Sequence, residues 1–334
     1  MKMNTLTHRI LVLLKRGFIG LAISIVVLAT LGSIYQALAT RSDRQNYPAP
    51  GQLIDIGGYR LHLYCIGENS DGSPTVILEQ ALGGISAGWA GVQPTIAQTT
   101  RVCSYDRAGM GWSDPSPEPR DAEHIATELH SLLHNAGVPA PYVLVGTSFG
   151  GLYVRMYADK YPEEVTGMVL LDSSHPAQLE TLYESFAGIY TVAPWLARIG
   201  VIRVTGLFQP DPGLPTPQNE AFKASFAATK DWDAQSAEFL ASLTNGDQVR
   251  NLKSLDDMPL FVLTATEHDS PPDQEKQWQE WQNELALLSN NSVHQVVDGA
   301  DHTSFWRDPE IAKLSVTAIL QVVEAARTDG RLKP

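Results

Sequence analysis

The segment that most restricts the fold of this chain runs from Tyr142 to Gly151 and reads YVLVGTSFGG. Its apolar start predicts a short buried strand, and the Gly-Thr-Ser-Phe-Gly that follows predicts a sharp turn into a helix. The flanking glycines let the backbone pass close to its neighbours, so the Ser148 hydroxyl projects from the end of the strand. The helix places unpaired amides and a positive dipole end beside that hydroxyl. The segment therefore predicts a nucleophilic serine, provided that a base and an acid follow.

The charge of the chain limits its partners. Of its 334 residues, 43% are hydrophobic and 18% charged, which is enough for a full hydrophobic core. Residues 41–334 carry 20 of the 24 Lys and Arg and all 37 Asp and Glu, so this part has a net charge of −17. A body this acidic repels nucleic acid and anionic lipid surfaces, and we expect neither as a partner of the body. Nothing in the composition predicts an oligomeric state.

The N-terminus predicts a targeting segment. Residues 17–40 contain no charge, and the most apolar part is 18–31. Four basic residues precede this stretch, which favours a cytoplasmic N-terminus and export of the rest. We therefore expect 1–40 to be a single-pass membrane anchor, followed by a tether over 41–50. The alternative is cleavage near Ala39, because Ala37-Leu38-Ala39 resembles a signal-peptidase site, and the product would then be secreted or periplasmic.

Strands and helices alternate after the tether, which is typical of an α/β domain. A hairpin is expected at 52–56 and 60–65, followed by apolar strands at 74–78, 101–105, 142–145, 168–171, 260–264 and 293–297. Helices are expected at 121–135 and after Pro309. Residues 173–257 lack a buried strand and contain helical stretches near 180–189, 194–199 and 219–243, so we expect a helical lid. The core would then consist of 51–172 and 258–334.

Four motifs resemble those of the α/β-hydrolase family, and the resemblance extends from Gly51 to the last helix. They are LEQALGG at 78–84, YDRAGMGWSD at 105–114, GTSFGG at 146–151 and GADH at 299–302. The resemblance implies a mostly parallel, eight-stranded sheet with helices on both faces and a helical lid. It also implies a catalytic triad in the order serine, acid, histidine.

The family's triad order assigns the remaining catalytic residues. Asp269 follows the strand after the lid, where the family usually has its acid; Glu267 and Asp172 are the alternatives. His302 lies between the last strand and the last helix, where the family has its general base, and His175 is second choice. A carboxylate beside the imidazole would hold one tautomer while the imidazole takes the Ser148 proton.

The oxyanion hole would consist of two backbone amides. Phe149 follows the nucleophile, and Leu82 lies in the loop after the third strand. This loop departs from the family pattern, because Gln80 and Ala81 stand where many members have His and Gly. Glu79 is a candidate ion-pair partner of Arg107.

Together these residues predict an enzyme that hydrolyses a small-molecule carboxylic ester through an acyl-enzyme. An aminopeptidase, an amidase or an acyltransferase could use the same triad. Dehalogenases and epoxide hydrolases of this fold have Asp at the position of Ser148, which argues against both. A noncatalytic binding module would normally have lost part of the triad. We expect no cofactor and no metal, because the chain has no His-x-His or His-Glu-x-x-His pattern.

The two cysteines, Cys65 and Cys103, lie in the second and fourth expected strands. The usual strand order of α/β-hydrolases places these strands side by side, and an exported body lies in an oxidising space, so a disulfide is expected. Two buried free thiols are the alternative.

Overall fold

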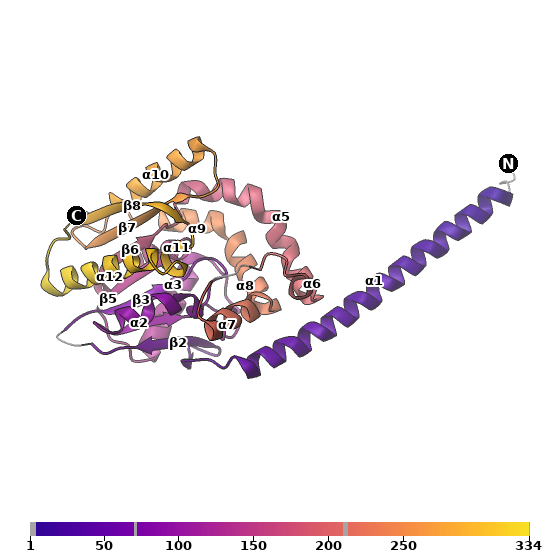
Figure 1. The fold of residues 1–334 in the computed structure, drawn as a ribbon, viewed down its shortest axis with the longest axis horizontal. Helices are drawn as coiled ribbons and strands as arrows, with labels where there is room; N and C mark the ends of the chain where they lie inside the picture. The colour runs from indigo at the N-terminus through magenta and orange to yellow at the C-terminus, as the bar shows by residue number, and fades with distance from the viewer. Residues whose placement is uncertain (1–4, 70–71, 210–212, 334) are drawn as a thin grey trace.

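The computed structural model describes residues 5–69, 72–209 and 213–333 (Figure 1). In this part of the chain, eight strands form one sheet in the order β1-β2-β4-β3-β5-β6-β7-β8. Strand β2 is antiparallel to β1 and β4, and the pairs from β4 to β8 are parallel, which confirms the expected hairpin and the mostly parallel sheet. The strands are β1 (Gln52–Asp55), β2 (Arg60–Ile66), β3 (Thr75–Glu79), β4 (Val102–Tyr105), β5 (Tyr142–Thr147), β6 (Val165–Leu171), β7 (Leu260–Glu267) and β8 (Ser292–Asp301).

The central strands are mostly apolar because both faces of the sheet are covered. Alternate side chains of a strand point to opposite faces. In β5, Tyr142 and Leu144 therefore join one hydrophobic cluster, and Val143 and Val145 join the other. All four side chains are almost completely buried.

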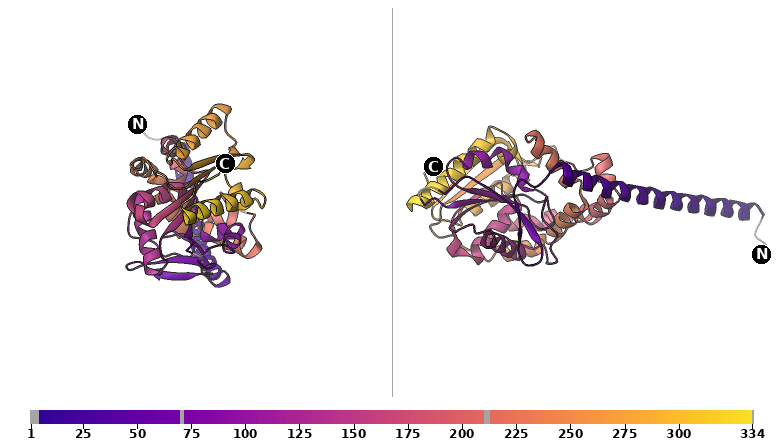
Figure 2. Two further views of the ribbon diagram at one scale, coloured as in Figure 1. Left: turned by 90° about the vertical axis from the view of Figure 1, so that its left-hand side faces the viewer. Right: turned by 90° about the horizontal axis from the view of Figure 1, so that it is seen from below.

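Helices cover both faces of this sheet (Figure 2). The first cluster includes side chains of α3 (Ala122–Asn135), α4 (Gly150–Lys160) and α10 (Pro272–Ala286). The second includes side chains of α2 (Gln93–Ile96), α11 (Ser304–Arg307) and α12 (Ile311–Thr328). Helix α3 matches its prediction, because the carboxylate of Asp121 caps it by accepting the His124 amide at 3.1 Å.

Among the described residues, five α-helices lie between β6 and β7 and form the lid (Figure 1). They are α5 (Leu179–Arg198), α6 (Val201–Thr205), α7 (Thr216–Phe226), α8 (Thr229–Leu240) and α9 (Ser242–Val249). Helix α5 is continuous through Pro194, although the sequence predicted two separate stretches. Ala193 and Ala197, on either side of the proline, are fully buried in a cluster with Trp232, and this packing compensates for the hydrogen bond that proline cannot make.

Helix α1 (Thr5–Asn46) extends away from the body (Figure 1). Its segment His8–Asn46 has a mean hydropathy of 2.3 in its most apolar window. Among the described residues, α1 is the one helix long and apolar enough to cross a membrane. A signal sequence has the same properties. The tether expected at 41–50 differs from the structure, because the helix continues to Asn46. Arg203 of the lid holds this last part, with Nη1 2.7 Å from Oδ2 of Asp43.

The two cysteines are direct partners across β2 and β4, and their sulfurs are bonded. The disulfide implied by the family resemblance is therefore confirmed. It joins the antiparallel edge of the sheet to the parallel part.

Candidate active site

Ser148 lies in the turn between β5 and α4 with a φ of +52°, in the left-handed region that most residues avoid. The surrounding glycines are needed because other backbone segments approach closely. A Cβ on Gly146 would lie 2.7 Å from the Gly150 carbonyl oxygen, and one on Gly150 would lie 2.7 Å from the Glu79 and Gln80 carbonyl oxygens. The tight packing therefore forces the strained turn, and strain of this kind is common at functional sites.

His302 and Asp172 meet at the carboxyl-terminal edge of the sheet. His302 follows β8, and Asp172 follows β6, so both come from loops beyond strand ends. Nδ1 of His302 lies 2.5 Å from Oδ2 of Asp172. The Asp172 side chain is fully buried, whereas that of His302 is about one third exposed. When the carboxylate accepts the Nδ1 proton, Nε2 is free to accept a proton from a nucleophile.

The acid predicted from the sequence is in a different position. Asp269 is exposed just beyond β7, and among the described residues the hydrogen bond to His302 comes from Asp172 rather than from Asp269. Glu267, another candidate, is also exposed. Strands β6 and β7 are neighbours, so both strand ends reach the same edge and only the loop directions separate the candidates. Asp172, one of the two alternatives to Asp269, is therefore the candidate acid that contacts His302.

Within the described part of the chain, four groups donate hydrogen bonds to the Asp172 carboxylate: His302, described above, and three others. The Ala265 amide and the Trp278 indole N–H donate to Oδ1 at 3.0 and 2.9 Å. Nε2 of His268 lies 2.9 Å from Oδ2, the oxygen that also contacts His302. Burial alone would raise the pKa of Asp172, but the hydrogen bonds and positive charges of His268 and His302 together outweigh it and hold the pKa below its ordinary value. Asp172 is thus kept ionised.

His268 is a residue of the site that the sequence interpretation missed. It bridges two carboxylates, because its Nδ1 also lies 2.7 Å from Oε2 of Glu275. Burial lowers its pKa, but the two carboxylates outweigh this effect and raise the pKa to about 9. Its partners Glu275 and Trp278 lie one turn apart on α10. The sequence indicates a role for His268 only through this spacing of Glu275 and Trp278 a few residues after it. The spacing is a weak signal, because the sequence does not show that α10 packs against the loop that carries His268.

The three residues Asp172, His268 and His302 also have the spacing of a metal site, since one ligand atom of each lies within 4.8 Å of the others. The same spacing arises when one carboxylate oxygen accepts a hydrogen bond from each of two imidazoles, as it does here. The donor set fits a hydrogen-bonded cluster without further groups.

The two amides expected to form the oxyanion hole are those of Leu82 and Phe149. Neither the Leu82 nor the Phe149 amide donates a hydrogen bond within the described chain, whereas the neighbouring Ala81 amide donates to Oε1 of its neighbour Gln80 at 2.9 Å. The Leu82 side chain packs on the core cluster that contains Phe149. The oxyanion hole stays a prediction, and the absence of a hydrogen bond from either amide within the described residues is compatible with it.

Arg107 holds the loop that carries Leu82. It donates from Nη1 to the Gln80 carbonyl and from Nη2 to the Ala81 carbonyl, at 2.8 and 2.9 Å. The expected ion pair with Glu79 is present at 2.5 Å, and Nε contacts Glu238 of α8 at 2.9 Å. The oxyanion loop and the lid are therefore joined through one buried guanidinium group.

The second-choice base, His175, is not part of this cluster. Its Nδ1 accepts the Ala177 amide at 3.2 Å and so caps a short 3-10 helix, while Nε2 lies 3.3 Å from Glu284. Burial and two nearby arginines lower its pKa to about 4. Of these two histidines, His302 is therefore the one that contacts Asp172.

Comparison with known proteins agrees with this fold. The family model of the alpha/beta hydrolase fold matches residues 74–191. The matched residues and the eight-stranded sheet both show that the chain has the α/β-hydrolase fold.

The proteins similar to this chain include an uncharacterized relative and solved structures of an esterase and an epoxide hydrolase. An uncharacterized protein of Schizosaccharomyces pombe is 27% identical over 78% of this chain, which spans 54% of that relative's length. A thermophilic esterase from Thermogutta terrifontis superposes with a TM-score of 0.60 at 21% identity, covering 81% of this chain and 98% of the esterase. The epoxide hydrolase CorEH superposes with a TM-score of 0.63 at 16% identity, covering 82% and 98%. At these identities the likeness concerns the fold alone, so the reaction must be argued from the site.

Proposed function

We propose that this chain is a serine hydrolase that cleaves carboxylic esters through an acyl-enzyme intermediate. The observation that carries the proposal is the contact of His302 with the buried, ionised Asp172 at the sheet edge where Ser148 occupies the tight β5–α4 turn. An imidazole oriented by a carboxylate is the group needed to activate a serine. A serine at this turn also distinguishes the chain from epoxide hydrolases of the same fold, which use an aspartate nucleophile.

Each group has one role in the proposed reaction. The Ser148 hydroxyl oxygen attacks the ester carbonyl carbon while its proton passes to Nε2 of His302. The negative oxygen that forms is held by the Phe149 and Leu82 amides. The carbon–oxygen bond to the alcohol then breaks, and His302 gives its proton to the departing alcohol. Water repeats the sequence on the acyl-enzyme, which releases the carboxylic acid and restores Ser148.

Asp172 and its donors orient the base. The carboxylate fixes the proton of His302 on Nδ1 and stabilises the imidazolium that forms during attack. The Ala265 amide and the Trp278 indole hold Oδ1, so the carboxylate cannot rotate away from His302. Pre-organisation of this kind lowers the cost of reaching the transition state.

Ser148→Ala is the direct test of the nucleophile. The variant should lose hydrolysis of p-nitrophenyl esters and labelling by a fluorophosphonate probe while it keeps the wild-type circular dichroism spectrum. A panel of esters of increasing chain length, run beside an amide and an epoxide, separates the esterase from the amidase and epoxide hydrolase. Wild-type turnover by Ser148→Ala would show that the nucleophile is wrong, and activity on the amide alone would move the chain to the peptidase group.

We further propose that α1 anchors the enzyme in a membrane and that the catalytic body lies outside the cytoplasm. The apolar helix, the basic residues before it and the disulfide in the body support this arrangement. The Gln36 amide donates to the Ala227 carbonyl of the lid at 2.8 Å, so cleavage near Ala39 would remove a contact of the body. Activity should sediment with membranes, resist high salt and dissolve only in detergent. A soluble protein that begins at Thr40 would show cleavage instead.

A further inference from the structure

The outer face of α5 is unusual for a protein surface because it carries no charge over more than three turns. The helix has no charged residue between Glu184 and Arg198. Its exposed side chains in that interval include Phe186, Ile189, Val192 and Trp195, and Trp195 is 67% exposed. The exposed face of a helix in water is normally polar or charged, and a continuous apolar patch marks a contact surface.

Helix α6 and the turn after it extend the same surface. Val204 is 71% exposed, and Leu207 and Phe208 are about two fifths exposed. Arg203 is the one charged residue of α6, and its guanidinium group is directed to α1, where Nε donates to Oε1 of Gln36 at 2.9 Å. We call this surface the apolar lid face; it comprises Phe186, Ile189, Val192, Trp195, Val204, Leu207 and Phe208.

The apolar lid face begins where α1 leaves the body. Gly32 of α1 packs so closely on the turn after α5 that a Cβ there would lie 2.1 Å from the Ile199 carbonyl oxygen. Figures 1 and 2 show α1 passing beside α5 and α6 before it extends away. The exposed apolar side chains of α1 continue as far as Leu38, so the apolar surfaces of α1 and of the lid meet.

The length of α1 places this meeting point at a membrane surface. The uncharged residues 17–40 rise about 36 Å as a helix, slightly more than the ~30 Å hydrocarbon core of a bilayer. Gly32 lies about 12 Å before Thr40 along the axis. A helix that lies on a membrane buries its apolar face by about 5–10 Å. The lid elements packed on Gly32 and Gln36 therefore lie at the depth of an interfacial helix.

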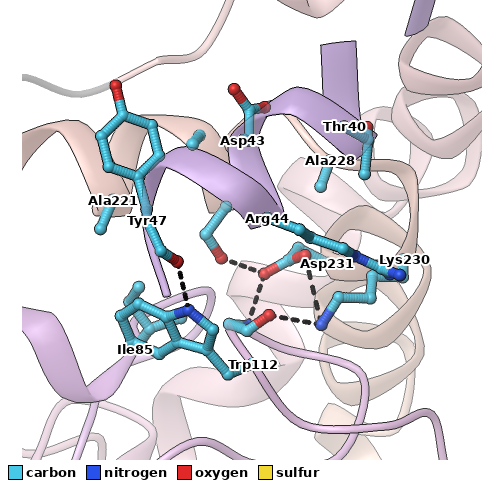
Figure 3. Close-up of a pocket in the computed structure, with 13 residues that line it drawn as sticks. Thr40, Asp43, Arg44, Tyr47, Ile85, Trp112, Ala221, Ala228, Lys230 and Asp231 are labelled. Atoms are coloured by element: carbon cyan, nitrogen blue, oxygen red, sulfur yellow. Dashed lines mark hydrogen bonds and ion pairs between the residues drawn. The ribbon is translucent and has the colours of Figure 1, made fainter. Parts of the chain in front are cut away.

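Positive charges occur just beyond the apolar residues, at the level expected for lipid headgroups. Arg41, Arg44, Arg198 and Lys230 line a hollow between α1 and the lid. Figure 3 shows Arg44 and Lys230 close together beside the last turns of α1. The end of α1 is itself fixed to the body, because the Trp112 indole donates to the Tyr47 carbonyl at 2.8 Å. Arg198 is paired with Asp233 at 2.8 Å, whereas no ion pair of Arg41 or Arg44 is found among the described residues. These two cations match the phosphate groups of lipids.

We propose that the apolar lid face rests in the interface of the bilayer that α1 spans, so the lid contacts lipid directly. The inference depends on the proposed membrane anchoring and not on ester hydrolysis. Helix α1 then fixes the orientation of the lid as well as tethering the body. Substrates that enter past α5 and α6 would come from the lipid phase.

Depth-dependent quenching in vesicles tests this arrangement on the full-length chain. Both native cysteines are bonded, so a cysteine introduced by V204C can be labelled alone with a polarity-sensitive fluorophore. The labelled protein is reconstituted in phosphatidylcholine vesicles with and without lipid that carries a nitroxide on its acyl chain. We expect strong nitroxide quenching and blue-shifted emission at position 204.

Two further variants provide the controls. V26C lies in the most apolar part of α1 and reports whether the helix is inserted. L287C replaces a leucine that is 83% exposed. This position lies near the start of β7, since the neighbouring Leu288 carbonyl accepts the Leu255 amide, and so at the edge of the sheet opposite the candidate site. Its label should remain unquenched.

The outcomes separate the two proposals. Quenching at position 26 without quenching at position 204 would refute the apolar lid face as a lipid contact and leave the anchor intact. No quenching at either position would refute both, independently of any hydrolysis. Blue-shifted emission at position 204 that nitroxide lipid does not quench would show that a second copy of the chain covers this face, which also overturns the proposal.

Discussion

Replacing Asp172 with asparagine should disable the base while leaving the fold in place. The asparagine side chain has the same shape, but it carries no charge and can present an N–H group where Oδ2 now contacts His302. The imidazole would then hold its proton on Nε2 and could not accept one from Ser148. Because the carboxylate is fully buried, no solvent can replace it beside Nδ1.

The expected loss follows from this geometry. Loss of the orienting carboxylate from a serine–histidine pair lowers kcat by about 10⁴-fold, which corresponds to about 5 kcal/mol of transition-state stabilisation. The measurement is kcat and KM on a short p-nitrophenyl ester, with circular dichroism to check the fold. We expect the loss in kcat and little change in KM, because the carboxylate does not contact the substrate.

Asp269→Asn is the matched control, since this residue is exposed and was the acid predicted from the sequence. It should change the rate less than about threefold, as is typical of surface positions away from a site. Equal rates for wild type and Asp172→Asn, or a larger loss in Asp269→Asn, would refute the assignment of the acid.

Three further outcomes are expected. The pKa of His268 is raised to about 9 from the ordinary 6.5, so its contribution to stability is fully present below pH ~6.5 and is lost as the pH rises to about 9. The denaturant midpoint of the wild type should therefore fall over this pH range, and the midpoint of His268→Gln should fall less. Without reduction, neither Cys65 nor Cys103 should react with iodoacetamide after denaturation, and alkylation of both would contradict the bond. Mutating both to serine should lower the free energy of unfolding by about 4 kcal/mol, because the bond closes a loop with a sequence separation of 38. Gly32→Ala should separate α1 from the lid and speed proteolysis between them, whereas Gly20→Ala, which has open space around it, should match the wild type; identical digestion patterns would contradict the close packing on Ile199.

The oxyanion loop shows how much the sequence could predict about the site. Phe149 and Leu82 were indicated by their places after two strands, and such backbone positions depend on loop order that local patterns reveal. The sequence predicts only part of the contacts that Arg107 makes with the oxyanion loop and the lid. Its pair with Glu79 could be suggested from two motifs, but its contact with Glu238 joins residues 131 positions apart and depends on how the lid packs.

The sequence by itself determined the elements of this protein: the buried strands, the turn that presents Ser148, the loop that carries His302, and an N-terminal apolar helix. These features are set by local periodicity, glycine positions and charge, which act within a few residues. The tertiary structure alone decided which acid contacts His302. Asp172, Glu267 and Asp269 all follow strands that end at one edge, and what separates them is burial and the donors supplied by Ala265, His268 and Trp278. Those donors come from β7, the loop after it and α10, so only the packed fold brings them to one carboxylate.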